Sequence, residues 1–277
     1  MSRIAARFDA LKAEGRGGLI TFLTAGDPDL DTSRDILMGL AGAGADLIEL
    51  GMPFSDPMAD GPAIQASSLR ALKGGMTLKK TLALVAEFRV QDNDTPVVLM
   101  GYYNPIYIHG TDAFITDAKA AGIDGLIIVD LPPEEVHEIK DAARAADIDI
   151  IFLTAPTSDD ARLPVIVKHA SGFVYYVSIT GVTGTQSADI GDIKDAVERL
   201  HRHTGLPIAV GFGIKTPQQA AEISAVANAA VVGSALVDVI TKNLDDDGNA
   251  KPGLTEKLLE LVSALGDGVR GVGKKVA

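Results

Sequence analysis

The sequence predicts an α/β protein, a single (β/α)8 TIM barrel with an extra N-terminal helix, in which residues 1–277 form one domain. Short apolar runs recur at intervals of about 30 residues, the size of one βαβ repeat. These runs are apolar throughout, which is typical of parallel strands covered on both faces. The length also fits, because barrels of about 250 residues routinely form one domain around one large core.

Eight apolar runs are the predicted strands. They are Leu19–Leu23, Leu47–Leu50, Val97–Met100, Leu126–Val129, Ile148–Leu153, Phe173–Val177, Ile208–Val210 and Ala230–Val232. Eight repeats favour a closed barrel over an open, doubly wound sheet. A doubly wound sheet should also carry a G-x-G-x-x-G pattern after its first strand, and residues 24–28 (TAGDP) lack it.

The predicted helices lie before and between these strands. Ile4, Phe8 and Leu11 have helical spacing and predict the extra helix that precedes the first strand. Residues 190–200 show the same spacing between two later strands. Residues 243–253 (NLDDDGNAKPG) predict a loop before a last helix.

The composition limits the partners and the location that we expect. The formal net charge of -12 repels polyanions, so neither nucleic acid nor an anionic membrane is an expected partner. No apolar stretch is long enough to span a bilayer, and the N-terminal segment lacks the apolar core of a signal peptide. A cytoplasmic protein is therefore expected. The chain has no cysteine, which excludes disulfides, thiolate nucleophiles and cysteine-ligated metals.

Residues 49–62 (ELGMPFSDPMADGP) are the most informative segment for function. Glu49 lies at the carboxyl end of a predicted strand, and Asp60 lies on the loop, stiffened by proline, that follows. In a barrel all such loops converge on one face, so the two carboxylates are candidates for acid–base chemistry. An ordinary surface loop would leave Glu49 unexplained, because an unpaired carboxylate is costly at the inner end of an apolar strand.

Glycines after the last three strands predict a phosphate site. Gly184, Gly213 and Gly233 allow the backbone to approach a ligand, and Ser234 is expected to cap the helix that follows. Residues 216–219 (TPQQ) form a capping box that begins another helix. Backbone N–H groups at helix starts bind anions, so this acidic protein needs no lysine or arginine there. Each glycine alone is more often a turn residue, but together they match the barrel phosphate site.

Several other barrel chemistries are not expected. A Schiff-base enzyme needs a lysine at a strand end, whereas Lys215 lies beyond the Gly213 turn and is expected to be exposed. The five histidines fall in helical or loop segments and are expected on the surface, so no metal is expected. Apolar residues at the strand ends are the predicted pocket walls, although each also reads as barrel core. They are Phe22, Met100, Ile128, Leu153 and Phe212.

The order and spacing of these motifs resemble one known family over nearly the whole chain. The motifs are residues 49–62, 101–105 (GYYNP), 130–135 (DLPPEE), 178–184 (SITGVTG), 210–214 (VGFGI) and 231–235 (VVGSA). They are similar to those of the tryptophan synthase α subunit. The resemblance implies a lyase of tryptophan biosynthesis that cleaves indole-3-glycerol phosphate to indole and glyceraldehyde 3-phosphate in a retro-aldol reaction. Ile179 stands where some members carry a basic residue, so no contact of that side chain is carried over.

The resemblance also implies a partner and a cofactor outside this chain. The expected partner is a β subunit that depends on pyridoxal phosphate (PLP), in an α2β2 heterotetramer in which indole is passed directly between subunits. This chain itself is expected to need no cofactor. Two alternatives remain at this stage. One is another phosphosugar barrel, such as an aminoaldose isomerase, although such enzymes lack the proline-stiffened loop. The other is a chain that acts mainly as an allosteric subunit of the β partner.

The chemistry of the cleavage agrees with the residues. Indole C3 must gain a proton and the C3′ hydroxyl must lose one, which a single carboxyl group with a raised pKa can do, and Glu49 suits that role. Asp60 can accept the indole N–H and stabilise its developing positive charge. Thr183 can hydrogen-bond Asp60 when the loops close. Tyr175 is equally consistent with a hydroxyl group near the glycerol chain and with a core position.

Overall fold

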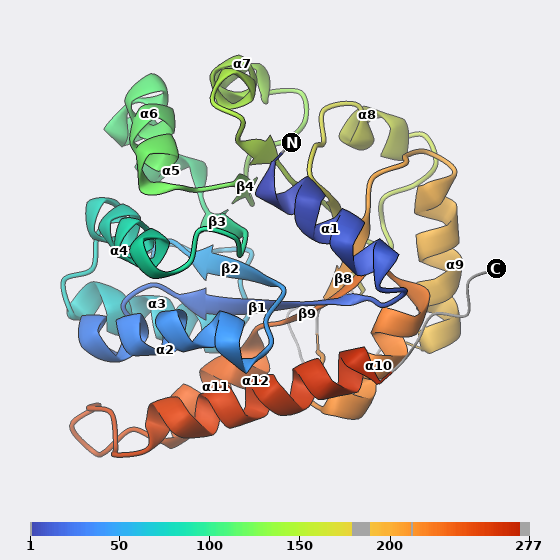
Figure 1. The fold of residues 1–277 in the computed structure, drawn as a ribbon. Helices are drawn as coiled ribbons and strands as arrows, with labels where there is room; N and C mark the ends of the chain where they lie inside the picture. The colour runs from blue at the N-terminus through green and yellow to red at the C-terminus, as the bar shows by residue number, and fades with distance from the viewer. Residues whose placement is uncertain (1, 179–188, 212, 272–277) are drawn as a thin grey trace.

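The computed structural model describes residues 2–178, 189–211 and 213–271, and Thr183, Gly184 and Phe212 lie outside these ranges. In the described residues, nine parallel strands form one sheet in the order β5-β4-β3-β2-β1-β9-β8-β7-β6 (Figure 1). The strands are β1 (Gly18–Thr24), β2 (Leu47–Gly51), β3 (Val97–Gly101), β4 (Gly125–Ile128), β5 (Asp149–Ile150), β6 (Phe152–Thr154), β7 (Val174–Val177), β8 (Ile208–Gly211) and β9 (Ala229–Val232).

The sheet closes into a barrel through β5 and β6, which are two halves of one predicted strand. β5 pairs with β4, β6 pairs with β7, and only Ile151 separates the two halves. The Ile151 N–H still donates to the Leu126 carbonyl of β4, over 2.9 Å, so the chain continues from one edge to the other. The eight-stranded barrel is thereby confirmed. The prediction of one unbroken strand here was wrong, because each half has a ladder partner on only one side.

Helices surround the barrel, and those that the sequence predicts are among them. They are α1 (Arg3–Ala13), α2 (Leu30–Ala43), α3 (Pro62–Lys73), α4 (Leu78–Gln91), α5 (Tyr103–His109), α6 (Thr111–Ala121), α7 (His137–Ala145), α8 (Leu163–Val167), α9 (Ile190–His201), α10 (Pro217–Val226), α11 (Ser234–Lys242) and α12 (Leu254–Arg270). The extra N-terminal helix and the loop between α11 and α12 are both confirmed.

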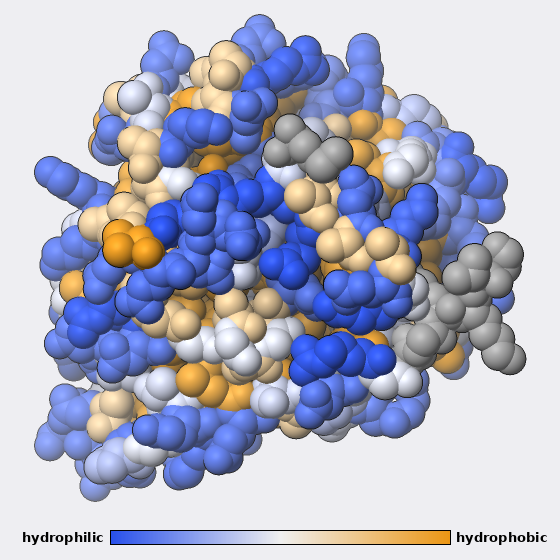
Figure 2. Space-filling model, viewed as in Figure 1, coloured by the Kyte–Doolittle hydropathy of each residue, from blue (hydrophilic) through white to orange (hydrophobic). Residues whose placement is uncertain are grey.

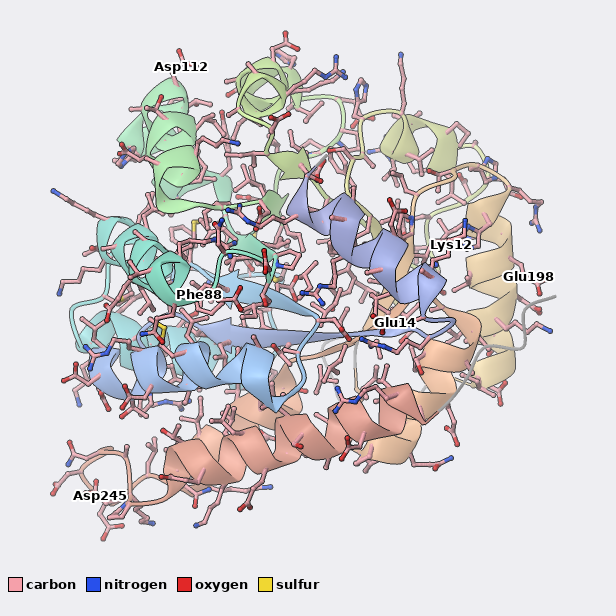
Figure 3. The ribbon with its side chains drawn as sticks, in the orientation of Figure 1. Lys12, Glu14, Phe88, Asp112, Glu198 and Asp245 are labelled. Atoms are coloured by element: carbon pink, nitrogen blue, oxygen red, sulfur yellow. The ribbon has the colours of Figure 1, made fainter. Side chains whose placement is uncertain are left out.

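Apolar side chains form two cores, because successive strand residues face opposite sides of the sheet. The outer core lies between the strands and the helices, where Phe88 of α4 is 1% exposed (Figure 3). The inner core fills the barrel itself. Asp112, Glu198 and Asp245, in contrast, extend outward from the molecule (Figure 3).

Helix α1 covers the end of the barrel at which the strands begin. It lies in front of the strands in Figure 1, and its residues Ile4, Phe8 and Leu11 belong to the inner core. Phe8 packs on Phe173, with ring centroids 5.8 Å apart. Arg3 adds an ion pair to the nearly buried Asp124, at 2.8 Å. Helix α1 thus covers the end of the barrel opposite the carboxyl ends of the strands.

The hydropathy of the surface agrees with the high net charge of the chain. The face in Figure 2 is largely hydrophilic, with apolar residues in small interrupted groups. Among the described residues, no helix combines the length and the apolar character that a membrane crossing requires.

Candidate active site

A cavity of about 480 Å³ opens at the carboxyl ends of the strands. It brings together Glu49, Asp60, Phe22, Met100, Tyr175, Gly213, Gly233 and Ser234, eight of the residues that the sequence singles out. The cavity also has three regions of different chemistry: two carboxyl groups, an apolar wall, and a glycine-rich end at a helix start. An elongated molecule with a proton-accepting group, an apolar ring and an anionic end would match these regions.

Glu49 is the buried acid of this cavity. It lies in β2, is 1% exposed, and its Oε1 atom has no hydrogen-bond partner among the described residues. Burial raises the pKa of Glu49 to about 8, and the negative charge of Asp60 adds to the rise. The side chain therefore holds its proton at neutral pH, and it can give that proton to a bound molecule.

Asp60 is the second carboxyl group, on the loop between β2 and α3. Its backbone carbonyl accepts from Gln65 Nε2 at 2.8 Å, and its Oδ2 atom accepts from the Tyr102 hydroxyl at 3.1 Å. Burial raises the pKa of Asp60, while the hydrogen bond from Tyr102 lowers it. Within the described residues, the two carboxyl groups thus differ in hydrogen bonding: Glu49 has an unpaired oxygen, and Asp60 is bound by a donor that favours its anion.

The apolar wall differs from the prediction at one position. Phe22, Met100 and Leu153 line the cavity, but Ile128 belongs to the outer core, and Val129 lines the cavity in its place. The expectation for Ile128 was wrong because strand residues alternate between faces. Ile128 therefore points toward the helices, and the next residue points inward.

Tyr175 lies within the barrel beside Glu49. It lines the cavity, and a side chain built at Gly211 would collide with its hydroxyl group. Burial raises the pKa of Tyr175 well above its ordinary value, and the charge of Glu49 adds to the effect. Tyr175 thus packs against the inner core and also lines the cavity, so its contact with the glycerol chain stays a prediction.

The glycine-rich end of the cavity is built from two loops. Gly213 has φ +83°, a conformation that favours glycine, and residues 216–219 form the expected capping box at the start of α10. The prediction that Ser234 caps α11 was wrong. Gly233 is the N-cap residue and Ser234 is the first residue of the helix, so the backbone N–H groups, rather than a side-chain oxygen, face this end. Such N–H groups suit an anion.

The sequence did not single out Lys215 and Tyr102 as site residues. Lys215 is exposed as expected, yet it also lines the cavity near Gly213. Tyr102 follows β3 and does not line the cavity itself, but its hydroxyl donates to Asp60, which does. The sequence signal that could have identified Tyr102 is its position in the GYYNP motif, directly after a strand.

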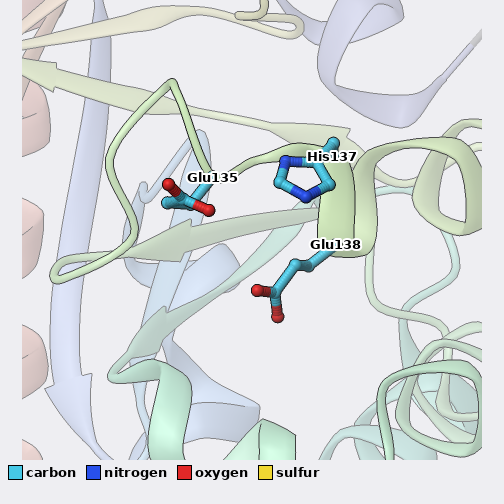
Figure 4. A group of neighbouring side chains, drawn as sticks. All are labelled: Glu135, His137 and Glu138. Carbon is cyan, nitrogen blue, oxygen red and sulfur yellow. The ribbon is translucent and has the colours of Figure 1, made fainter.

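A separate group of polar side chains lies on the surface near α7. Glu135, His137 and Glu138 place one ligand atom each within 4.8 Å of one another, and all three side chains are exposed (Figure 4). Glu138 Oε2 already accepts from the Tyr103 hydroxyl at 2.7 Å. None of the three lines the cavity in the part of the chain that the structure describes. We assign the group to the hydrated surface.

A closed (β/α)8 barrel with a proton-holding carboxyl group in its open end is the architecture of a barrel enzyme that works by acid–base catalysis. The comparisons with known proteins narrow this class. The family model described as "Tryptophan synthase alpha chain" matches residues 8–265, and the chain therefore belongs to this family. The protein is a lyase of tryptophan biosynthesis, whose reaction cleaves indole-3-glycerol phosphate to indole and glyceraldehyde 3-phosphate.

Solved structures agree with this family over nearly their full length. Tryptophan synthase subunit alpha from Legionella pneumophila str. Paris is 36% identical with a TM-score of 0.90, and the match covers 98% of this chain and 100% of that one. Tryptophan synthase from M. tuberculosis in an aminoacrylate-bound form is 35% identical with a TM-score of 0.85, covering 97% and 100%. A protein from Aquifex aeolicus VF5 is 37% identical with a TM-score of 0.87, covering 98% and 100%. The aminoaldose isomerase alternative is not favoured by these matches.

Proposed function

We propose that Glu49 carries the proton in this cleavage. The observation behind the proposal is its burial, with one oxygen that has no hydrogen-bond partner in the described part of the chain, and a pKa of about 8, which keeps it protonated at neutral pH. Protonated Glu49 gives its proton to indole C3, and the carboxylate left behind takes the proton of the C3′ hydroxyl. The C3–C3′ bond then breaks, its electron pair restores the indole ring, and C3′ becomes the aldehyde carbon of glyceraldehyde 3-phosphate. Glu49 ends the cycle protonated, as it began.

We further propose that Asp60 stabilises the positive charge that protonation at C3 places on the indole nitrogen. A carboxylate that accepts the indole N–H does so most strongly in a site that excludes water. Phe22 and Met100 would enclose the indole ring together with Phe212, and Tyr175 would contact the glycerol chain. Thr183 would hydrogen-bond Asp60 in the closed state. Thr183 and Phe212 lie outside the described residues, so their roles rest on the sequence.

For the phosphate group, we propose the backbone N–H groups around Gly213, Gly233 and Ser234, with Gly184 as a further member outside the described residues. The start of α11 supplies the helix dipole, and the absence of a Cβ at Gly233 leaves room for the ligand. A Cβ there would lie 3.2 Å from Phe22 Cβ, which is a crowded contact. The phosphate would thus be held mainly by neutral groups.

The proposed partner is a tryptophan synthase β subunit, in an α2β2 heterotetramer in which indole passes between subunits. Family membership and the likeness to the solved structure of tryptophan synthase from M. tuberculosis support this proposal. PLP would belong to the β subunit, and we propose no cofactor for this chain. We also propose a cytoplasmic location, and a single domain over residues 1–277.

The experiment is to supply the isolated chain with indole-3-glycerol phosphate and to measure indole release, with and without a β subunit. We expect slow release by the chain alone, faster release with the partner, and a loss of at least about 10²-fold in Glu49→Gln. Release that does not differ between wild type and Glu49→Gln would refute the catalytic proposal. Release that occurs only with the partner and is unaffected by Glu49→Gln would instead make this chain mainly an allosteric subunit.

A further inference from the structure

Tyr102 connects the end of β3 to the loop that carries Asp60. It is 2% exposed, and its ring stacks on Phe54, with centroids 5.3 Å apart and 28° between the planes. Its hydroxyl accepts from the Ala59 N–H at 3.0 Å and is placed 3.1 Å from Asp60 Oδ2. Tyr102, which is fixed to the barrel, therefore contacts the loop at Phe54, Ala59 and Asp60.

These contacts determine the direction of the hydrogen bond to Asp60. A tyrosine hydroxyl has one proton, and a backbone N–H can only donate. Because the Ala59 N–H occupies the hydroxyl oxygen as an acceptor, the proton of Tyr102 remains available for Asp60 Oδ2. A donor to a carboxylate favours its ionised form. Tyr102 therefore stabilises the Asp60 anion through Oδ2, and Oδ1 has no hydrogen-bond partner among the residues that the structure describes.

The arrangement also fixes the position of Asp60. The loop is exposed at Ser55, Asp56 and Met58, where the hydrogen bonds stay within the loop: Ser55 donates to Asp56 Oδ2 at 2.6 Å, and the Met58 N–H donates to the Asp56 carbonyl at 2.9 Å. Asp60, in contrast, is bound at its side chain by Tyr102 and at its carbonyl by Gln65. A group on a rigid strand end is a more precise support than one on a loop.

We propose that Tyr102 is a positioning residue for the cleavage: its hydroxyl holds Asp60 as an anion, with Oδ1 directed at the indole N–H. This inference rests on the role proposed above for Asp60. Tyr102 itself need not touch the substrate. Its hydrogen bond to the Asp60 carboxylate would contribute to the reaction by keeping that group charged and in a fixed position.

Several charged or titratable groups face Asp60 or Tyr102. Glu49 from β2 and Tyr175 from β7 line the same cavity, and Asp238 from α11 and Lys215 lie toward its glycine-rich end. Asp130, after β4, acts on Tyr102. Glu49 is neutral below pH 8, so in acid the ionisation of Asp60 depends chiefly on its burial and on Tyr102.

The test is Tyr102→Phe, which removes one oxygen atom and keeps the ring that stacks on Phe54. The matched control is Tyr103→Phe, because the Tyr103 hydroxyl bonds Glu138 and lies outside the cavity. We expect kcat for indole formation to fall roughly 10-fold in Tyr102→Phe and to stay at the wild-type value in Tyr103→Phe. The pH below which activity is lost should rise in Tyr102→Phe, because Asp60 loses the donor that favours its anion.

A double variant separates this inference from the proposal for Asp60. If Tyr102 acts through Asp60, Tyr102→Phe should cause no further loss in an Asp60→Asn background. Equal losses in both backgrounds, or an unchanged pH profile in Tyr102→Phe, would overturn the positioning role. If Asp60→Asn retained full activity, the proposed role of Asp60 would fail first. Urea unfolding of each variant provides the control for stability.

Discussion

The substitution Glu49→Gln should make the protein more stable at neutral pH, although it removes the proposed proton carrier. In the unfolded chain, Glu49 should titrate near its ordinary pKa of 4.5, whereas in the folded chain its pKa is about 8. A raised carboxyl pKa means that the folded state binds the proton more tightly. As far as Glu49 is concerned, the free energy of unfolding is therefore highest below pH 4.5, and it falls as the pH rises toward 8. Glutamine has nearly the same shape and does not titrate.

The size of the effect follows from the two pKa values. Each pKa unit corresponds to about 1.4 kcal/mol, so at pH 7 burial of Glu49 costs the wild-type protein about 3 kcal/mol relative to its unfolded chain. At pH 9 the cost approaches about 5 kcal/mol, and at pH 5 it is below about 1 kcal/mol. Both the neutral acid and the amide leave polar atoms unpaired at this position, so the two proteins should be nearly equal in acid.

The assay is urea unfolding of both proteins, followed by circular dichroism at pH 5, 7 and 9. A single domain should give one cooperative transition in each case, and the difference in free energy of unfolding should grow with pH. A difference that is the same at all three pH values would show that Glu49 is not a buried acid of raised pKa. If Glu49→Gln were less stable than wild type at pH 9, the reasoning would be refuted.

Two further substitutions test the phosphate end and loop closure. Gly233→Asp places a negative charge at the start of α11, and Gly233→Asn is its isosteric control. The KM for indole-3-glycerol phosphate should rise at least about 10-fold more in Gly233→Asp than in Gly233→Asn. Equal KM values in the two variants would refute the proposed anion site. Thr183→Val keeps the shape of the side chain and deletes its hydroxyl, so kcat should fall while the urea midpoint of the free protein stays unchanged. Full activity in Thr183→Val would make Thr183 only a turn residue.

The sequence predicts the barrel well because each strand is a run of apolar residues between turn-forming residues. Such a run, however, gives no information on which side chain faces inward. Ile127, Ile128 and Val129 are all apolar, and only the register of β4 in the sheet decides that Ile128 faces the helices. The exact start of α11 was missed for a related reason, because Gly233 and Ser234 are both ordinary N-cap residues.

The carboxyl groups of the site could be predicted, and their supporting residue could not. Glu49 is conspicuous because a charged residue at the end of an apolar strand requires an explanation. Tyr102 is not conspicuous, since a tyrosine after a strand fits a core position equally well. Its partner Asp60 lies 42 residues earlier in the chain, and only the fold brings the two together.

The central claim is that Glu49 transfers the proton, and the pH dependence of kcat/KM for indole formation tests it most directly. This constant reports the groups of the free enzyme, so it should decline tenfold per pH unit above about 8, as Glu49 loses its proton. Glu49→Gln should bind substrate, should release indole at least about 10²-fold more slowly, and should show no such decline. A Glu49→Gln protein with substantial activity and the same decline above pH 8 would contradict the claim, because another group would then have to carry the proton.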